Sequence, residues 1–235
     1  MPRVLLLQVG HTFEEVARER GDYDLWFAHG LGLHQGELEV VRVFAGQALP
    51  HGWDHDGIVV TGSWSMVTDR EPWSEASAEY LREAVMRQRP VLGVCYGHQL
   101  LAHALGGQVG YNPKGRHAGT SHVTLTEAAA SDPLFASFAS PLVMQVSHSQ
   151  SVLTLPAEAV LLGHCAMDPH HAFRIGAHAW GVQFHPEFDA DVSRRYIEMR
   201  RATIQAEGLD PDALIAGIEE SLHGKLLLRK FVELL

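Results

Sequence analysis

Cysteine is scarce in this chain, and long apolar runs are missing from it. Only two of its 235 residues are cysteines, Cys95 and Cys165. Two thiols cannot form the disulfide framework of a small secreted domain, so we expect a reducing, cytoplasmic environment. The apolar run at residues 4–9 is too short to cross a membrane, and no small-residue cleavage site follows it. The sequence therefore predicts no membrane association.

Positive charge is also in deficit. Lysine and arginine number 18 against 28 acidic residues, which gives a formal net charge of −10. A chain this acidic, with no basic cluster, is poorly suited to follow a phosphate backbone, so we expect no nucleic-acid partner. What is present is ordinary for a globular protein: 46% of residues are hydrophobic and 20% are charged. The length allows one large α/β domain.

The first half of the chain alternates short apolar runs with helical patterns. Strands are predicted over 4–9, 38–44, 57–60 and 91–94, and helices over about 74–87 and 97–105. Strands that alternate with helices indicate a parallel sheet covered by helices on both faces.

The second half consists mainly of short strand-like segments punctuated by turn signals. They lie at 108–111, 121–126, 142–146, 160–164, 172–175 and 179–184. A helix is predicted from the N-cap Asp189 to about Glu207, and Asp210-Pro211 predicts the start of one or two more. We therefore expect an α/β fold with a mostly parallel central sheet flanked by helices, an antiparallel extension and C-terminal helices.

The pattern Gly93-Val94-Cys95-Tyr96-Gly97 stands where an apolar strand runs directly into a helix. This is the nucleophile-elbow arrangement with sulfur in place of a hydroxyl group. Glycine two residues on either side relieves the crowding of such a sharp turn, and the helix N-terminus favours a thiolate. The alternative is a small buried core residue, which is the interpretation we prefer for the other thiol, Cys165. The flanking glycines favour a nucleophile at Cys95.

A cysteine nucleophile needs a base, and the base needs an orienting group. His185 follows an apolar strand, and Glu187 comes two residues later. Residues i and i+2 of an extended chain project to the same side, and Pro186 favours extended backbone between them. A surface histidine is the alternative, since the chain has 16 histidines. The pairing with Glu187 favours a catalytic role.

The segments Gly93–Gln99 (GVCYGHQ) and Gly181–Glu187 (GVQFHPE) together resemble the class I glutamine amidotransferases. The similarity is closest to the glutaminase domain of GMP synthase and its stand-alone relatives. It implies a flavodoxin-like three-layer domain over residues 1–200, with residues 201–235 as a helical C-terminal extension of the same domain.

The resemblance also implies an activity and a set of site residues. Glutamine or a γ-glutamyl small molecule would be the substrate, hydrolysed at its side-chain amide through a cysteine thioester with release of ammonia. Cys95, His185 and Glu187 would form the triad, and the backbone N–H groups of Ser63 and Tyr96 the oxyanion hole. The implied substrate-binding residues are Gly62, Gln99, Ser147 and His148.

The implied function leaves alternatives open. Many relatives have a second glycine where this chain has Ser63, and stand-alone enzymes that trim γ-glutamyl conjugates carry serine there, so a γ-glutamyl peptidase is a second hypothesis. A non-catalytic binding or redox-sensing protein on the same fold is a third. For a glutaminase, the motifs occupy most of the chain, so a separate synthetase would accept the ammonia.

The histidines suggest no metal or other cofactor. His164 with His170-His171, and His11 with His29 and His34, are close only in sequence. Neither group has the Cys/His spacing of a zinc site or a helical His-Glu-x-x-His pattern. We therefore predict neither a metal site nor a cofactor.

Overall fold

A computed structural model describes residues 2–34 and 36–235, so the first residue of the predicted domain lies outside the described part. A nine-stranded sheet forms the centre, in the order β2-β1-β3-β4-β11-β10-β9-β6-β7. Five strands are parallel, and the remaining four continue the sheet in antiparallel pairing. Within the described residues, no helix is long and apolar enough to cross a membrane. The predicted α/β fold with an antiparallel extension is confirmed.

The parallel strands are short, and four of the five are entirely buried because helices cover both of their faces, whereas the edge strand β2 is only partly buried. They are β2 (Leu38–Arg42), β1 (Val4–Gln8), β3 (Gly57–Val60), β4 (Val91–Val94) and β11 (Ala179–Val182). One hydrophobic core lies on each face of the sheet, and alternate residues of β1 pack into each of them. Val4 and Leu6 belong to the core on one face, and Leu5 and Leu7 belong to the core on the other.

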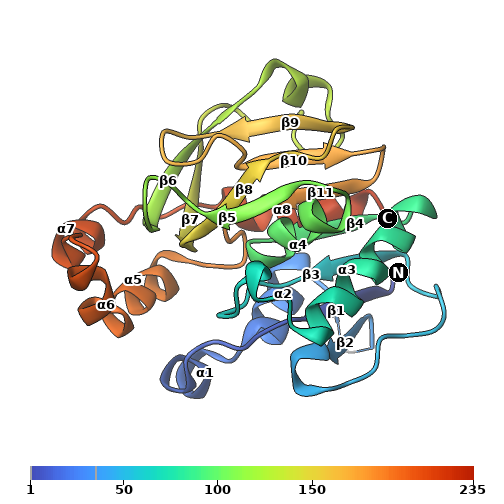
Figure 1. Ribbon diagram of the computed structural model, residues 1–235, viewed down its shortest axis with the longest axis horizontal. Helices are drawn as coiled ribbons and strands as arrows, with labels where there is room; N and C mark the ends of the chain where they lie inside the picture. Colours follow the sequence, from blue (N-terminus) through green and yellow to red (C-terminus); the bar gives the residue numbers. More distant parts are fainter. Residues whose placement is uncertain (1, 35) are drawn as a thin grey trace.

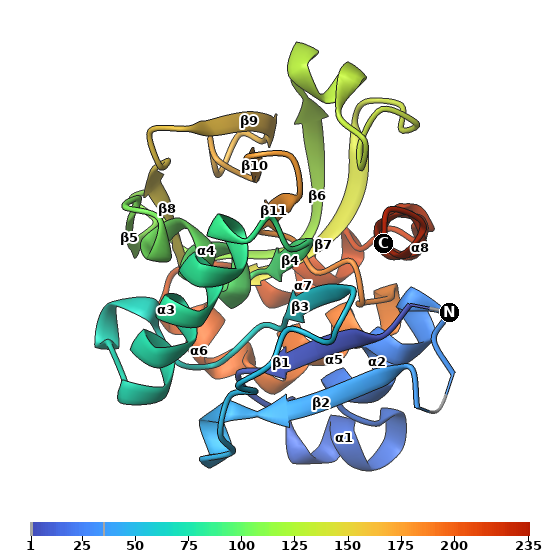
Figure 2. The ribbon, with the colours of Figure 1, turned by 90° about the vertical axis from the view of Figure 1, so that its right-hand side faces the viewer.

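The antiparallel strands extend the sheet beyond β11 and rise above the parallel half in Figures 1 and 2. They are β10 (Ala172–Ile175), β9 (Ala159–His164), β6 (His117–Leu125) and β7 (Leu142–His148). A separate two-stranded sheet pairs β5 (Gln108–Tyr111) with β8 (Gln150–Thr154).

Helices pack on both sides of the parallel strands. Buried side chains of α2 (Tyr23–Leu31) and α8 (His223–Glu233) share one core. Those of α3 (Pro72–Met86) and α4 (Tyr96–Ala104) share the other. Leu227, Leu228 and Phe231 of α8 are fully buried, so the C-terminal helix is part of the main core.

The remaining helices include two departures from the predictions. The helix predicted over 189–207 is interrupted at Arg200 and forms α5 (Ala190–Met199) and α6 (Arg201–Ala206). No prediction was made for α1 (Glu14–Arg20) or α2. The first is short, and the second (YDLWFAHGL) is apolar on most sides, so neither shows a clear amphipathic period. The helix expected after Asp210 is α7 (Pro211–Ala216), and α8 follows it.

Candidate active site

Cys95 lies on the turn between β4 and α4, at the carboxyl edge of the parallel strands. Its backbone has φ of 51° and ψ of −99°, a conformation that non-glycine residues rarely adopt. The turn is held because Cys95 N–H donates to Val182 O of β11 at 2.9 Å, while Gln99 N–H donates to Cys95 O at 3.1 Å. The cysteine is therefore fixed at the helix N-terminus in a strained conformation typical of a nucleophile elbow.

The two glycines that flank Cys95 are required by close backbone contacts. A Cβ atom added to Gly97 would lie 2.6 Å from Val60 O of β3, and one added to Gly93 would collide with the Gly97 carbonyl group. Real Cβ atoms do not approach other atoms this closely, so larger residues would push the turn away from the sheet. The reason given for these glycines from the sequence is confirmed.

His185 and Glu187 meet just beyond the end of β11. The His185 Nδ1 atom lies 2.7 Å from Glu187 Oε1, and both side chains are almost completely buried. The backbone N–H of His185 donates to Gln145 O of β7, which links the histidine to the antiparallel part of the sheet. Cys95 is close enough to His185 for its charge to raise the pKa of the ring. The structure thus brings these three residues together.

The electrostatic setting of His185 favours its charged form. Burial alone would lower its pKa, but Glu187 and Cys95 more than offset this effect and raise the pKa to about 10. At pH 7 the ring is an imidazolium ion between a carboxylate and a sulfur atom. A neighbouring imidazolium stabilises a thiolate, which is the reactive form of cysteine.

Two neighbours fix the orientation of the His185 ring. Phe188 stacks on it with ring centroids 4.1 Å apart and an interplanar angle of 15°. Gly62, after β3, faces the ring from another side, since an added Cβ atom would lie 2.9 Å from His185 Cε1. The side chain of His185 therefore has little room to move.

Replacing Gly62 by alanine is expected to lower kcat by about 10–100-fold, because a displacement of about 1 Å in a catalytic group has effects of this size. Steady-state turnover of the two proteins measures the change. Gly217→Ala is the matched control, because its added Cβ atom would meet no atom closer than 3.5 Å. A Gly62→Ala variant with unchanged kcat would contradict the close packing described here.

Ser63 and Tyr96, the expected oxyanion-hole residues, both border the pocket that contains Cys95. In the described part of the chain, neither backbone N–H group donates a hydrogen bond to another protein group. Ser63 Oγ instead accepts a hydrogen bond from Ser65 N–H at 3.1 Å. Both amides are thus available to a bound oxyanion.

The other expected substrate-binding residues occupy different positions around this pocket. Gln99, Ser147 and His148 line it, whereas Gly62 lies behind it against His185. The Gln99 amide is already engaged, because its Nε2 donates to Gln150 O at 2.7 Å and to Gln183 Oε1 at 3.0 Å. The His148 ring is also engaged, because its Nδ1–H donates to Gln150 O at 2.9 Å.

Two arginines in the pocket wall were missed by sequence reasoning. Arg116 Nε and Nη2 contact the Glu207 carboxylate at 2.6 and 2.8 Å, so its charge is partly neutralised. The Arg200 guanidinium lies 3.8 Å from the ring centroid of Trp64, and its side chain makes no hydrogen bond to the described residues. Burial and the nearby Arg116 lower the pKa of Arg200 to about 10, so it stays charged at pH 7. Nothing in the local sequence distinguishes these residues from surface arginines.

A larger hollow of about 530 Å³ lies at the opposite end of the sheet. It is lined by residues near the starts of β4 and β11, including Arg89 and His178. Ligands of open α/β sheets bind beyond the carboxyl ends of the strands, and this hollow contains no nucleophile. The pocket at Cys95 is therefore the candidate active site.

The fold and this pocket define a three-layer α/β protein with a cysteine–histidine–glutamate constellation at the carboxyl edge of its parallel strands. Residues 23–201 match the family described as glutamine amidotransferase class-I. That match spans most of the chain, so the protein belongs to the class I glutamine amidotransferase family.

Individual relatives carry different activities in their names. The glutamine amidotransferase-like protein YfeJ of Salmonella typhimurium is 34% identical over 67% of each chain. Gamma-glutamyl peptidase 5 of Arabidopsis thaliana is 28% identical, over 75% of this chain and 72% of that one. The GMP synthase of Aeropyrum pernix is 34% identical over 79% of this chain, but the match spans only 33% of that longer protein.

Solved structures agree in fold. A glutamine amidotransferase from Thermotoga maritima aligns with a TM-score of 0.75 and 21% identity, covering 99% of this chain and 97% of that one. A second, from Methylobacillus flagellatus, aligns with a TM-score of 0.76 and 21% identity, covering 99% and 95%.

Proposed function

We propose that this protein hydrolyses the side-chain amide of glutamine through a γ-glutamyl thioester on Cys95 and releases ammonia. The observation that carries the proposal is the buried constellation of Cys95, His185 and Glu187, with the cysteine in a strained backbone conformation at a helix N-terminus. Family membership supports a glutamine-like substrate.

In the proposed first step, the Cys95 thiolate attacks the amide carbon of glutamine. The negative charge that develops on the oxygen is stabilised by the N–H groups of Ser63 and Tyr96. His185 then gives its proton to the departing nitrogen, the C–N bond breaks and ammonia leaves. The side chain of Glu187 holds the imidazole in the orientation that this transfer requires.

In the second step, water attacks the thioester while the now neutral His185 takes a proton from it. The C–S bond breaks, glutamate is released, and the thiolate–imidazolium pair is restored. Nothing in this cycle consumes the ammonia, so we expect a separate synthetase to accept it if the protein supplies a biosynthetic reaction.

The test is ammonia release from L-glutamine by the purified chain, measured beside glutamate release from γ-glutamyl dipeptides. Hydrolysis of glutamine, lost in Cys95→Ala, is the expected result. Turnover of dipeptides without glutamine would replace the proposal by the peptidase function. Absence of turnover and of covalent labelling by an electrophilic glutamine analogue would overturn both.

Hydrolysis of γ-glutamyl peptides is a second candidate function, and Arg200 is the observation that favours it. Glutamine has one carboxylate, whereas a γ-glutamyl amino acid carries a second one on its leaving group. A charged guanidinium with no protein hydrogen bond in the described residues is suited to bind that second carboxylate. Similarity to gamma-glutamyl peptidase 5 points in the same direction.

Arg200→Gln is expected to raise KM for γ-glutamyl dipeptides by about 10–100-fold, the usual value of a charge-assisted hydrogen bond. Arg201→Gln is the matched control, because Arg201 pairs with Asp212 outside the pocket. A rise in KM confined to dipeptides assigns Arg200 to the second carboxylate, and an equal rise for glutamine assigns it to the α-carboxylate. Unchanged KM for both substrates would remove Arg200 from the site.

A further inference from the structure

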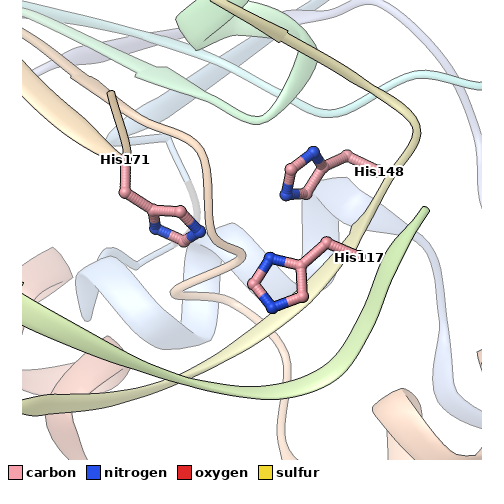
Figure 3. Close-up of side chains that lie close together, drawn as sticks. All are labelled: His117, His148 and His171. Carbon is pink, nitrogen blue, oxygen red and sulfur yellow. The ribbon is translucent and has the colours of Figure 1, made fainter. Parts of the chain in front are cut away.

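Three histidines from separate parts of the chain converge beside the active-site pocket. His117 starts β6, His148 ends β7 directly opposite it, and His171 precedes β10. One ring nitrogen from each lies within 4.8 Å of the others, and Figure 3 shows the three rings turned toward one another. His148 and His171 are buried, and His117 is half-buried.

The hydrogen bonds around this cluster leave ring nitrogens without partners. His148 Nδ1 lies 2.9 Å from Gln150 O, and a carbonyl oxygen can only accept, so Nδ1 carries the proton. The lone pair is then on Nε2, which is buried and has no partner among the described residues. In the same part of the chain, His117 Nδ1 and both ring nitrogens of His171 also lack partners. Buried polar atoms are rarely left unsatisfied.

The His148 arrangement has the form of a metal ligand. Metal-binding histidines usually donate their second N–H to a carbonyl or carboxylate, which fixes the tautomer and aims the other nitrogen at the ion. Metals bind neutral imidazole through the lone pair of such an unpartnered nitrogen. The buried Asp168 carboxylate, whose charge acts on His117, would partly balance an added cation.

We propose that His117, His148 and His171 form a binding site for a zinc ion. Three imidazoles and one further position for water make a tetrahedral set that suits Zn²⁺. Zn–N bonds of about 2.0–2.1 Å place ligand nitrogens about 3.3 Å apart in such a site, so nitrogens that now lie up to 4.8 Å apart must approach one another by up to about 1.5 Å. The side chains need only small rotations, because their backbones already surround the space.

The position of the site gives the ion a structural role. It would join the β6–β7 pair to the segment before β10, which contains His171. The carbonyl oxygen of His171 accepts a hydrogen bond from Gln183 N–H at 2.9 Å, and Gln183 lies two residues before His185. It would also hold residues 147–150, which line the active-site pocket. Zinc would therefore order one wall of the pocket without taking part in the reaction.

The test uses the full chain without an affinity tag, stripped of metal by a chelator and then titrated with ZnCl₂. We expect about one tightly bound zinc per chain by elemental analysis after gel filtration, and a rise in Tm of about 5–10 °C at a hundredfold excess over Kd. Co²⁺ in place of Zn²⁺ should give the visible absorption of a tetrahedral nitrogen site. These measurements do not depend on catalytic activity.

His117→Gln and His171→Gln should each weaken zinc binding by at least about tenfold. Loss of a residue that only hydrogen-bonds to a metal ligand already lowers metal affinity by about this factor, and loss of a ligand should lower it at least as much. His117 is the less buried of the two, so His117→Gln should disturb the fold less than His171→Gln. The Tm of each variant without metal shows whether it still folds. His122→Gln is the matched control, because His122 lies on the same strand but is exposed and pairs with Glu219. Binding retained in both ligand variants, or lost only in Cys95→Ala, would overturn the proposal, and so would no uptake at micromolar zinc.

Discussion

Replacement of Cys95 by alanine is expected to reduce hydrolysis of glutamine by at least about 10⁴-fold. Removal of the nucleophile from a triad leaves only the contribution of the oxyanion hole and of substrate binding. The fold should be retained. Alanine, like cysteine, has an unbranched Cβ atom, so the substitution adds no strain to the positive φ of residue 95. Ammonia release and thermal unfolding, measured on the same preparation, separate the two effects.

The second thiol provides the control for this prediction. Cys165 is half-buried and does not line the pocket that contains Cys95, so Cys165→Ala should keep wild-type activity. An electrophilic glutamine analogue should add its mass once to the wild type and to Cys165→Ala, and not to Cys95→Ala. Labelling of Cys95→Ala, or activity that depends on Cys165, would contradict the assignment of the nucleophile.

Replacement of Glu187 by glutamine is expected to lower kcat by roughly 10³–10⁴-fold, as loss of the orienting carboxylate does in a comparable triad. The Glu187 side chain is fully buried and its Oε1 contacts His185 Nδ1 at 2.7 Å. Glutamine has nearly the same shape but no charge, so the imidazolium ion loses its main stabilising partner. Glu198→Gln, an exposed change on α5, is the control.

The same variant should also change the pH profile. In the wild type the pKa of His185 is raised to about 10, above its usual value of 6.5. The stabilisation from its charge is therefore fully present below about pH 6.5 and is lost as pH rises through about 10. The alkaline limb of kcat/KM should lie near pH 10 in the wild type and move to lower pH in Glu187→Gln. An alkaline limb at the same pH in both proteins would show that Glu187 does not hold the proton on His185.

Much of the fold follows from local sequence. The fully buried strands β1, β3, β4 and β11 are apolar runs of four to five residues, and the predicted segments coincide with them to within two residues. Two helix starts were also predicted from the sequence, at Asp189 and Asp210. Asp189 Oδ1 accepts a hydrogen bond from Val192 N–H, and Asp210 Oδ1 accepts one from Asp212 N–H, as expected of N-cap residues. These features depend on neighbours within a few residues of each other, so the sequence displays them directly.

Elements without a local signal were the ones that sequence reasoning missed. Helix α2 is buried on several sides, so its apolar residues show no period, and its N-cap Asp22 is also bonded to Thr12 N–H from a separate turn. Strand β8 has the polar residues Gln150 and Ser151 buried against neighbouring elements. The break at Arg200 between α5 and α6 places its guanidinium over Trp64, a contact across most of the chain. Tertiary packing overrides local preference in such places.

The sequence by itself determined the α/β class, the turn that carries Cys95, and the pairing of His185 with Glu187, because each rests on spacing within a few residues. The tertiary structure decided which further distant residues share the pocket. Arg116 joins its wall from just before β6 and Arg200 from the end of α5, and His117, His148 and His171 meet beside it from three separate segments. Their proximity depends on how the antiparallel strands fold back over the parallel sheet, and no local pattern encodes that arrangement.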